Sequence, residues 1–125
     1  MNLLLDTHLF IWWLKDDKRL SKKARTLIID ADIVYVSSVS IWEAAIKIQL
    51  GKLDSDISVL AESIEKEGFV EFPLTVNQVT QVTRLPAYHR DPFDRMLIAQ
   101  AISEPLRFLT ADKVLKQYSE LVDLV

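Results

Sequence analysis

Apolar and β-branched residues gather in five short runs along the chain, each of strand length and each separated from the next by a longer mixed segment. The first run is three consecutive leucines, and the last contains an aspartate among its aliphatic residues. Their positions are residues 3–5, 33–36, 69–72, 107–110 and, less clearly, 121–124. We expect these runs to form five β-strands.

Segments with the apolar spacing that is typical of helices lie between and after these runs. They cover residues 8–15, 21–30, 40–50, 56–67, 75–84, 92–103 and 112–118. Because strands alternate with helices, neighbouring strands need crossover connections, which favour a parallel sheet with helices on both faces. The pattern therefore predicts an α/β fold.

Residues that commonly cap helices stand at the beginning of several of these segments. Ser40 with Glu43 three residues later has the form of a capping box. Asp91, Pro92 and Asp94 offer an acidic N-cap, a proline at the first helical position and an acid in the first turn. Further N-caps are expected at Ser21 and Thr75.

The length of 125 residues and the 50% hydrophobic composition suit one core, so we expect residues 1–125 to form a single domain. The absence of cysteine excludes disulfides and thiolate ligands, so oxygen or imidazole would have to hold any metal. The apolar start of the chain lacks the flanks of a signal peptide, and no apolar stretch approaches the ~20 residues that span a bilayer. A cytoplasmic location without membrane contact is expected.

The formal net charge of −3 argues against nucleic-acid binding, because affinity for a phosphate backbone comes largely from Lys and Arg. Divalent cations bound by acidic residues would reverse this charge locally. Basic residues could line the approach to such a site, or could be ordinary solvated charges. The candidates are Lys47, Lys52, Arg84, Arg90 and Arg95.

Four acidic residues are expected near one edge of the sheet. Asp6 directly follows the first predicted strand, and Asp112 stands just after the fourth. The carboxyl ends of parallel strands border the ligand crevice of an open α/β sheet. Glu43 and Asp94 are expected in the first turns of two helices that begin near this edge, so the four carboxylates can converge.

Such a cluster suits Mg²⁺ or Mn²⁺, which prefer carboxylate oxygens, water and substrate phosphate as ligands. Bound in this way, the ions can activate a water and stabilise the leaving oxygen when a phosphodiester is hydrolysed. No protein nucleophile is then needed. This fits a chain with only His8 and His89 and with no nucleophile elbow or Gly-rich phosphate loop.

Each acid also has a structural explanation. Glu43 and Asp94 could serve only at helix starts, where the helix dipole favours an acid by about 0.3–1 kcal/mol. Asp112 could only cap the last helix, and Asp91 is expected to be mainly an N-cap. Asp6 is harder to explain in this way, because an acid among apolar neighbours is costly unless it is paired or metal-bound.

The hydroxyl, imidazole and indole side chains near these acids are less informative. Thr7 and Thr110 could orient a carboxylate, or could serve only in turns. His89 could bind RNA or transfer protons, although a lone histidine in a loop usually does neither. Helical positions favour packing over base stacking for Trp12, Trp13 and Trp42.

The order of these residues resembles the PIN-domain ribonucleases and, among them, the VapC-type toxins of bacterial and archaeal toxin–antitoxin pairs. Four stretches in the family's order carry the likeness and together span nearly the whole chain. They are LLLDTHLFIWWL (3–14), SSVSIWEAAIKIQLGKL (37–53), HRDPFDRMLIAQA (89–101) and FLTAD (108–112).

The resemblance implies a PIN-like three-layer α/β/α sandwich with a central, mainly parallel sheet of about five strands. It implies RNA as the substrate, a homodimer, and inhibition by a cognate antitoxin protein. Thr110 would be the family's hydroxyl residue just before the last acid. The quartet that binds Mg²⁺ or Mn²⁺ would be Asp6, Glu43, Asp94 and Asp112.

Two aspartates could supply the third acid of the quartet. Asp91 and Asp94 are close in sequence, and we choose Asp94 for its distance from residues 99–101. Arg95 follows it where small and aliphatic residues are common in the family, and could contact phosphate, an antitoxin carboxylate or Asp94 itself.

Two other functions remain open. The chain could be a non-catalytic RNA- or protein-binding PIN module, although acids at all four expected positions argue against a loss of activity. It could be a phosphatase of the haloacid-dehalogenase type with Asp6 as nucleophile, but the second Asp expected there is absent. A dimer is also suggested by the apolar side chains of Phe10, Trp13 and Leu14, which exceed what one helix face needs.

Overall fold

The computed structural model describes residues 1–125 and contains one five-stranded sheet in which every neighbouring pair of strands is parallel. The order across the sheet is β3-β2-β1-β4-β5, so the first strand lies at the centre. The strands are β1 (Asn2–Leu5), β2 (Ile33–Ser37), β3 (Val70–Phe72), β4 (Arg107–Thr110) and β5 (Val122–Leu124). The five predicted strands are therefore confirmed.

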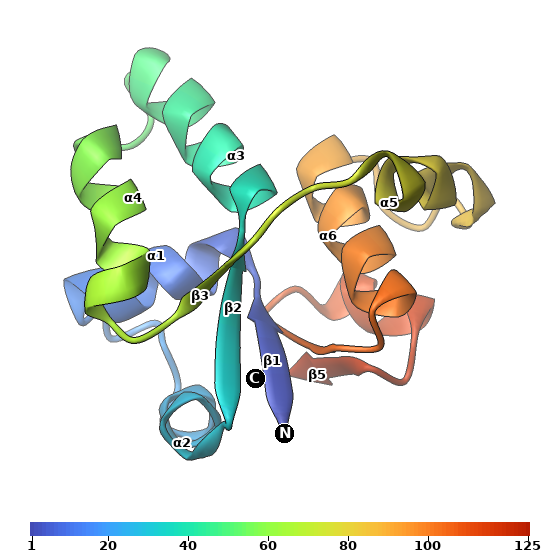
Figure 1. The fold of residues 1–125 in the computed structure, drawn as a ribbon, viewed down its shortest axis with the longest axis horizontal. Helices are drawn as coiled ribbons and strands as arrows, with labels where there is room; N and C mark the ends of the chain where they lie inside the picture. The colour runs from blue at the N-terminus through green and yellow to red at the C-terminus, as the bar shows by residue number, and fades with distance from the viewer.

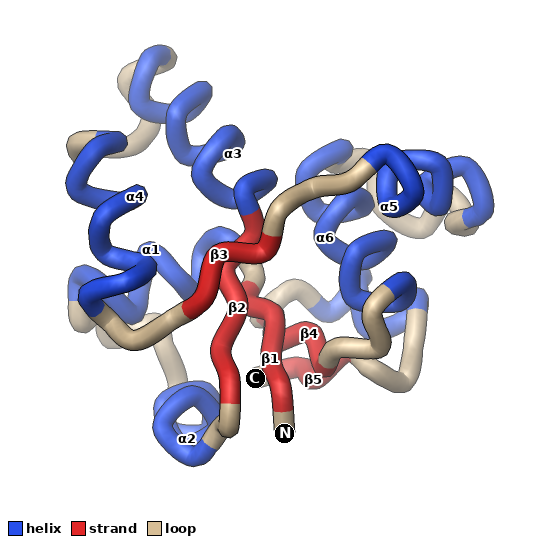
Figure 2. Tube along the Cα trace, in the orientation of Figure 1, coloured by secondary structure: helices blue, strands red, loops and turns tan.

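Helices cover both faces of this sheet, which confirms the predicted three-layer α/β/α sandwich. Helices α1, α2 and α4 lie on one side and α5 and α6 on the other (Figure 1), and Figure 2 shows the strands between them. The helices are α1 (Thr7–Lys15), α2 (Lys22–Asp30), α3 (Ser38–Gln49), α4 (Ile57–Lys66), α5 (Val76–Gln81) and α6 (Pro92–Ser103). The predicted segment 75–84 ends in a 3₁₀ helix, η1 (Val82–Arg84). The predicted segment 112–118 forms a second 3₁₀ helix, η2 (Lys113–Tyr118).

The central strand explains why the chain begins with three leucines. Leu3 and Leu5 pack into a cluster with residues of α1, α2 and α4, whereas Leu4 packs into a second cluster with residues of α6 and η2. Successive side chains of a strand point to opposite faces, so a strand covered on both faces needs apolar residues at every position. The last residue of this buried strand is followed directly by Asp6, which is thereby held at the centre of the sheet edge.

The predicted caps at Ser21, Thr75 and Asp91 are confirmed. The predicted capping box at Ser40 is wrong: the N-cap of α3 is Ser37, whose Oγ accepts from the amide of Val39 at 3.0 Å. Strand β2 ends at Ser37, and that serine is an equally good cap three residues earlier. The helix therefore begins one turn earlier, and Glu43 lies in its second turn.

The residues that suggested a dimer belong largely to the core of this chain. Phe10 is buried, and Trp13 and Leu14 pack against the cluster that holds Leu3 and Leu5. Phe10 therefore gives no reason to expect a dimer, whereas Trp13 and Leu14 are only partly buried in the single chain. Separately, none of the helices has both the length and the hydropathy that crossing a membrane requires.

Candidate active site

Asp6 and Asp112 come together because β1 and β4 are parallel neighbours. The amide of Asp6 donates to the carbonyl of Leu109 at 2.9 Å, so the chain just beyond β1 stays beside β4. Asp6 also caps α1 by accepting from the amide of His8 at 2.9 Å. Its side chain is buried, with only 4% of the residue exposed.

Thr110 connects these two acids. Its hydroxyl donates to Oδ2 of Asp6 at 2.6 Å, and its Oγ1 accepts from the amide of Asp112 at 3.1 Å. Thr110 is fully buried, so both bonds are shielded from water. The sequence left two roles open for Thr110, orientation of a carboxylate or a place in a turn. The bond to Asp6 supports the first role, and the bond from the amide of Asp112 is a turn contact made at the same time.

Glu43 reaches the same region from the second turn of α3 and is 1% exposed. Its Oε2 accepts from Nζ of Lys47 at 2.7 Å. Its Oε1 is buried and has no hydrogen-bond donor. A buried carboxylate oxygen without a donor is costly, because it loses its hydrogen bonds to water on folding and gains none from the protein. This oxygen is the clearest sign that the arrangement suits a cation.

Asp94 lies in the first turn of α6, and its amide is capped by Oδ1 of Asp91 at 3.1 Å. Burial raises the pKa of Asp94 to about 7, and repulsion from Asp6, Asp91 and Glu43 adds to the shift. Repulsion of this kind requires the acids to be close together. Asp94 therefore shares one electrostatic environment with Asp91, which caps the same helix, and with carboxylates from two other segments of the chain.

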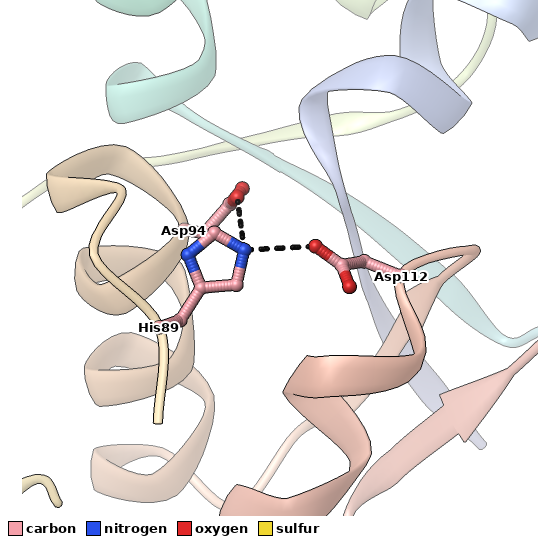
Figure 3. A group of neighbouring side chains, drawn as sticks. All are labelled: His89, Asp94 and Asp112. Carbon is pink, nitrogen blue, oxygen red and sulfur yellow. Dashed lines mark hydrogen bonds and ion pairs between the residues drawn. The ribbon is translucent and has the colours of Figure 1, made fainter. Parts of the chain in front are cut away.

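His89, whose role the sequence left open, lies between two of the acids (Figure 3). Its Nε2 is 2.8 Å from Oδ2 of Asp112 and 3.5 Å from Oδ2 of Asp94. Its Nδ1 accepts from the amide of Asp91 at 3.0 Å, so the proton of a neutral ring is on Nε2 and is donated to Asp112. The ligand atoms of His89, Asp94 and Asp112 lie within 4.8 Å of one another.

The loop that carries His89 is fixed by Tyr118 and Arg95. The hydroxyl of Tyr118 accepts from the amide of His89 at 2.9 Å, and Arg95 donates to the carbonyl of Pro86 at 2.9 Å and to the Tyr118 hydroxyl at 3.2 Å. Arg95 is therefore used to hold this loop, and none of its bonds is to Asp94. The histidine was missed because these contacts join segments far apart in sequence.

Three of the four acids line one pocket of about 310 Å³, which we call the carboxylate pocket. Glu43 does not line this pocket, and its negative charge contributes to the raised pKa of Asp94. At the mouth of the pocket, contact with the carboxylate of Asp6 raises the pKa of His8. The pocket is lined by Asp6, His8, Trp12, Arg19, Asp94, Ala111 and Asp112.

Comparison with known proteins agrees with this architecture. The profile of the family described as PIN domain matches residues 3–121. The chain is 30% identical over 123 residues to Ribonuclease VapC22 of Mycobacterium tuberculosis, an alignment that covers 93% of this chain and 91% of that protein.

Solved structures with the same fold are more distant in sequence. VapBC2 from Rickettsia felis bound to a promoter DNA fragment gives a TM-score of 0.72 at 14% identity, covering 100% of this chain and 98% of that one. FitAcB from Neisseria gonorrhoeae gives a TM-score of 0.62 at 18% identity, covering 90% and 89%. With the profile match and the VapC relative, these findings confirm the predicted family, and the chain belongs to the PIN-domain family.

Proposed function

We propose that this protein is an endoribonuclease that uses Mg²⁺ or Mn²⁺ to hydrolyse RNA phosphodiester bonds and that it is the toxin of a toxin–antitoxin pair. The observation that carries the proposal is the convergence of Asp6, Asp94 and Asp112 on one pocket, together with the buried Glu43, one of whose oxygens has no donor. The similarity to Ribonuclease VapC22 supports RNA as the substrate.

We assign the metal ligands to Asp6, Glu43, Asp94 and Asp112. All four offer the carboxylate oxygens that hard divalent cations prefer. When bound, Mg²⁺ or Mn²⁺ supplies a water of lowered pKa and charge stabilisation at the reacting phosphate. Asp94 would give up its proton as the ion enters, because a nearby divalent charge favours the carboxylate.

The neighbouring residues position these ligands. Thr110 holds one oxygen of Asp6, and His89 holds one oxygen of Asp112. Bonds of this kind fix which oxygens face the ion and limit the rotation of each carboxylate. The chain therefore contributes a negatively charged metal-binding site whose carboxylates are held in fixed orientations.

Replacing Thr110 with valine should reduce the cleavage rate by about 10- to 100-fold, because the bond that orients Asp6 is lost while the side-chain shape is kept. The free energy of unfolding should fall by about 1–3 kcal/mol, since a buried acceptor loses its donor. Initial cleavage rates and urea denaturation measure the two effects. Thr83→Val removes an exposed hydroxyl that bonds only to the carbonyl of Thr80, and it should change neither quantity.

We further propose that the chain forms a single PIN-like domain, a homodimer, and a complex with a cognate antitoxin. The profile match over residues 3–121 supports the single domain. The similarity of the fold to VapBC2 and FitAcB supports a protein partner. Light scattering of the purified chain, alone and after co-expression with the product of the adjacent gene, would test both assemblies.

The catalytic proposal is tested by incubating the purified chain with a mixed tRNA and rRNA pool in Mg²⁺, in Mn²⁺ and in EDTA. Single-stranded DNA and a small phosphomonoester serve as comparison substrates. We expect defined RNA fragments that require metal. Retention of RNA without cleavage by a folded chain would favour the non-catalytic module, and release of phosphate from the monoester would favour a phosphatase.

A further inference from the structure

We propose that a second pocket beside the carboxylates binds the phosphate backbone of the RNA strand next to the phosphate that is cleaved. This inference rests on the proposed function and specifies where its substrate lies. The pocket has a volume of about 380 Å³, and we call it the lysine pocket. Its lining includes His8, Trp12, Lys15, Arg19, Lys47 and Lys52.

The two pockets adjoin each other, because His8, Trp12 and Arg19 line both of them, and we call the two together the groove. The charge of the side chains that line the groove changes sign from one pocket to the other. The carboxylate pocket contains three acids, whereas the lysine pocket contains four cations and no acid. A strand with one phosphate at metal ions in the first pocket would place its adjoining phosphates in the second, where the fixed charge is positive.

The cations of the lysine pocket differ in how firmly they are engaged. Arg19 is paired with Asp17 at 2.8 Å and lies over the ring of Trp12 at 5.0 Å, while Lys47 is bound to Glu43. Lys15 makes one long bond, from Nζ to a backbone carbonyl at 3.3 Å.

Lys52 has no partner for its ammonium group, although its backbone amide donates to the carbonyl of Lys47 at 2.9 Å. Lys15 and Lys52 are therefore the two ammonium groups most available to an anion, since neither is held by a carboxylate. Both line the lysine pocket, and neither lines the carboxylate pocket. They can be replaced without touching Asp6, Glu43, Asp94 or Asp112.

The arrangement favours RNA over an acidic segment of a protein partner. A polynucleotide carries one negative charge at every step, so it can interact with bound metal and with the lysines at the same time. A single carboxylate side chain would satisfy only one pocket. The alignment of both pockets along one groove is therefore better explained by a repeating anion.

The test measures the binding of fluorescein-labelled single-stranded RNA by anisotropy at several NaCl concentrations. All proteins are full-length chains that carry Asp6→Asn to prevent cleavage. The double variant Lys15→Gln/Lys52→Gln is compared with Lys22→Gln/Lys66→Gln, which removes the same charge from exposed positions outside the groove. Thermal unfolding verifies that each chain is folded, and Lys52→Gln alone provides a milder change.

We expect the Lys15/Lys52 variant to bind RNA about tenfold more weakly at low salt, with a salt slope shallower by about 1.4, since each lost single-strand phosphate contact removes about 0.7. The control should match the parent. Equal affinity and slope for the two double variants would overturn the proposal. So would a larger loss of affinity for a poly-glutamate peptide than for RNA, which would mark the pocket as a protein-binding site.

The outcome is separable from that of the catalytic proposal. If the chain cleaves no RNA with metal but the Lys15/Lys52 variant still shows the shift, the lysine pocket stands and the nuclease proposal fails. If the chain cleaves RNA and the shift is absent, the nuclease proposal stands and the proposal for the lysine pocket fails.

Discussion

Replacing Asp6 with asparagine is expected to lower the rate of RNA cleavage by about 10³-fold or more, because the change removes one charge from the proposed metal site. Asparagine has nearly the same shape, and its amide oxygen can accept one of the bonds now made by Thr110 and by the amide of His8. The chain should therefore remain folded. Initial rates in saturating Mn²⁺ and a thermal melt measure the two properties.

The matched control is Asp30→Asn, which removes one exposed acid at the end of α2, away from the carboxylate pocket. It should cleave RNA at the rate of the parent chain. If the Asp6 and Asp30 variants were equally active, the carboxylate pocket would not be the site of catalysis.

Replacing Asp94 with asparagine should make the metal-free chain more stable above neutral pH. The pKa of Asp94 is raised to about 7 in the folded chain, whereas the unfolded value is 3.8. Between these values the folded state holds a proton that the unfolded state has lost, so stability falls as the pH rises. The effect reaches about 4 kcal/mol at pH 8, and asparagine removes it because it resembles the protonated acid.

Urea denaturation in EDTA at pH 5, 6, 7 and 8 measures this effect. The parent chain and Asp30→Asn should lose stability across the series relative to Asp94→Asn. Added Mn²⁺ should stabilise the parent at pH 8 and leave the Asp94 variant nearly unchanged. If the stability of the parent and of Asp94→Asn changed with pH in the same way, Asp94 would be an ordinary ionised acid. The argument that buried acids cluster around it would then lose its support.

The sequence predicted the sheet well because the physical signals were local. A strand buried on both faces must be apolar throughout, and the leucines before Asp6 meet that requirement. The carboxyl ends of parallel strands then meet at one edge, so the proximity of Asp6 and Asp112 could be anticipated from their positions alone.

The features that the sequence did not predict depend on choices between equivalent residues or on distant contacts. Ser37 and Ser40 are both good caps, and only the end of β2 selects the first. His89 enters the site because Tyr118, 29 residues later, accepts from its amide. No periodicity or cap reports such a contact, although His89 begins one of the stretches that carry the resemblance to PIN domains.

The central claim is that the carboxylates of Asp6, Glu43, Asp94 and Asp112 hold divalent metal as a set. The most direct test is a crystal structure of the full chain grown with Mn²⁺, with anomalous scattering used to locate the ions. We expect at least one peak within bonding distance of Oε1 of Glu43 and of the Asp94 carboxylate, and no such peak in Asp94→Asn crystals. Ordered Mn²⁺ elsewhere on the chain, with the carboxylate pocket free of anomalous signal, would contradict the claim.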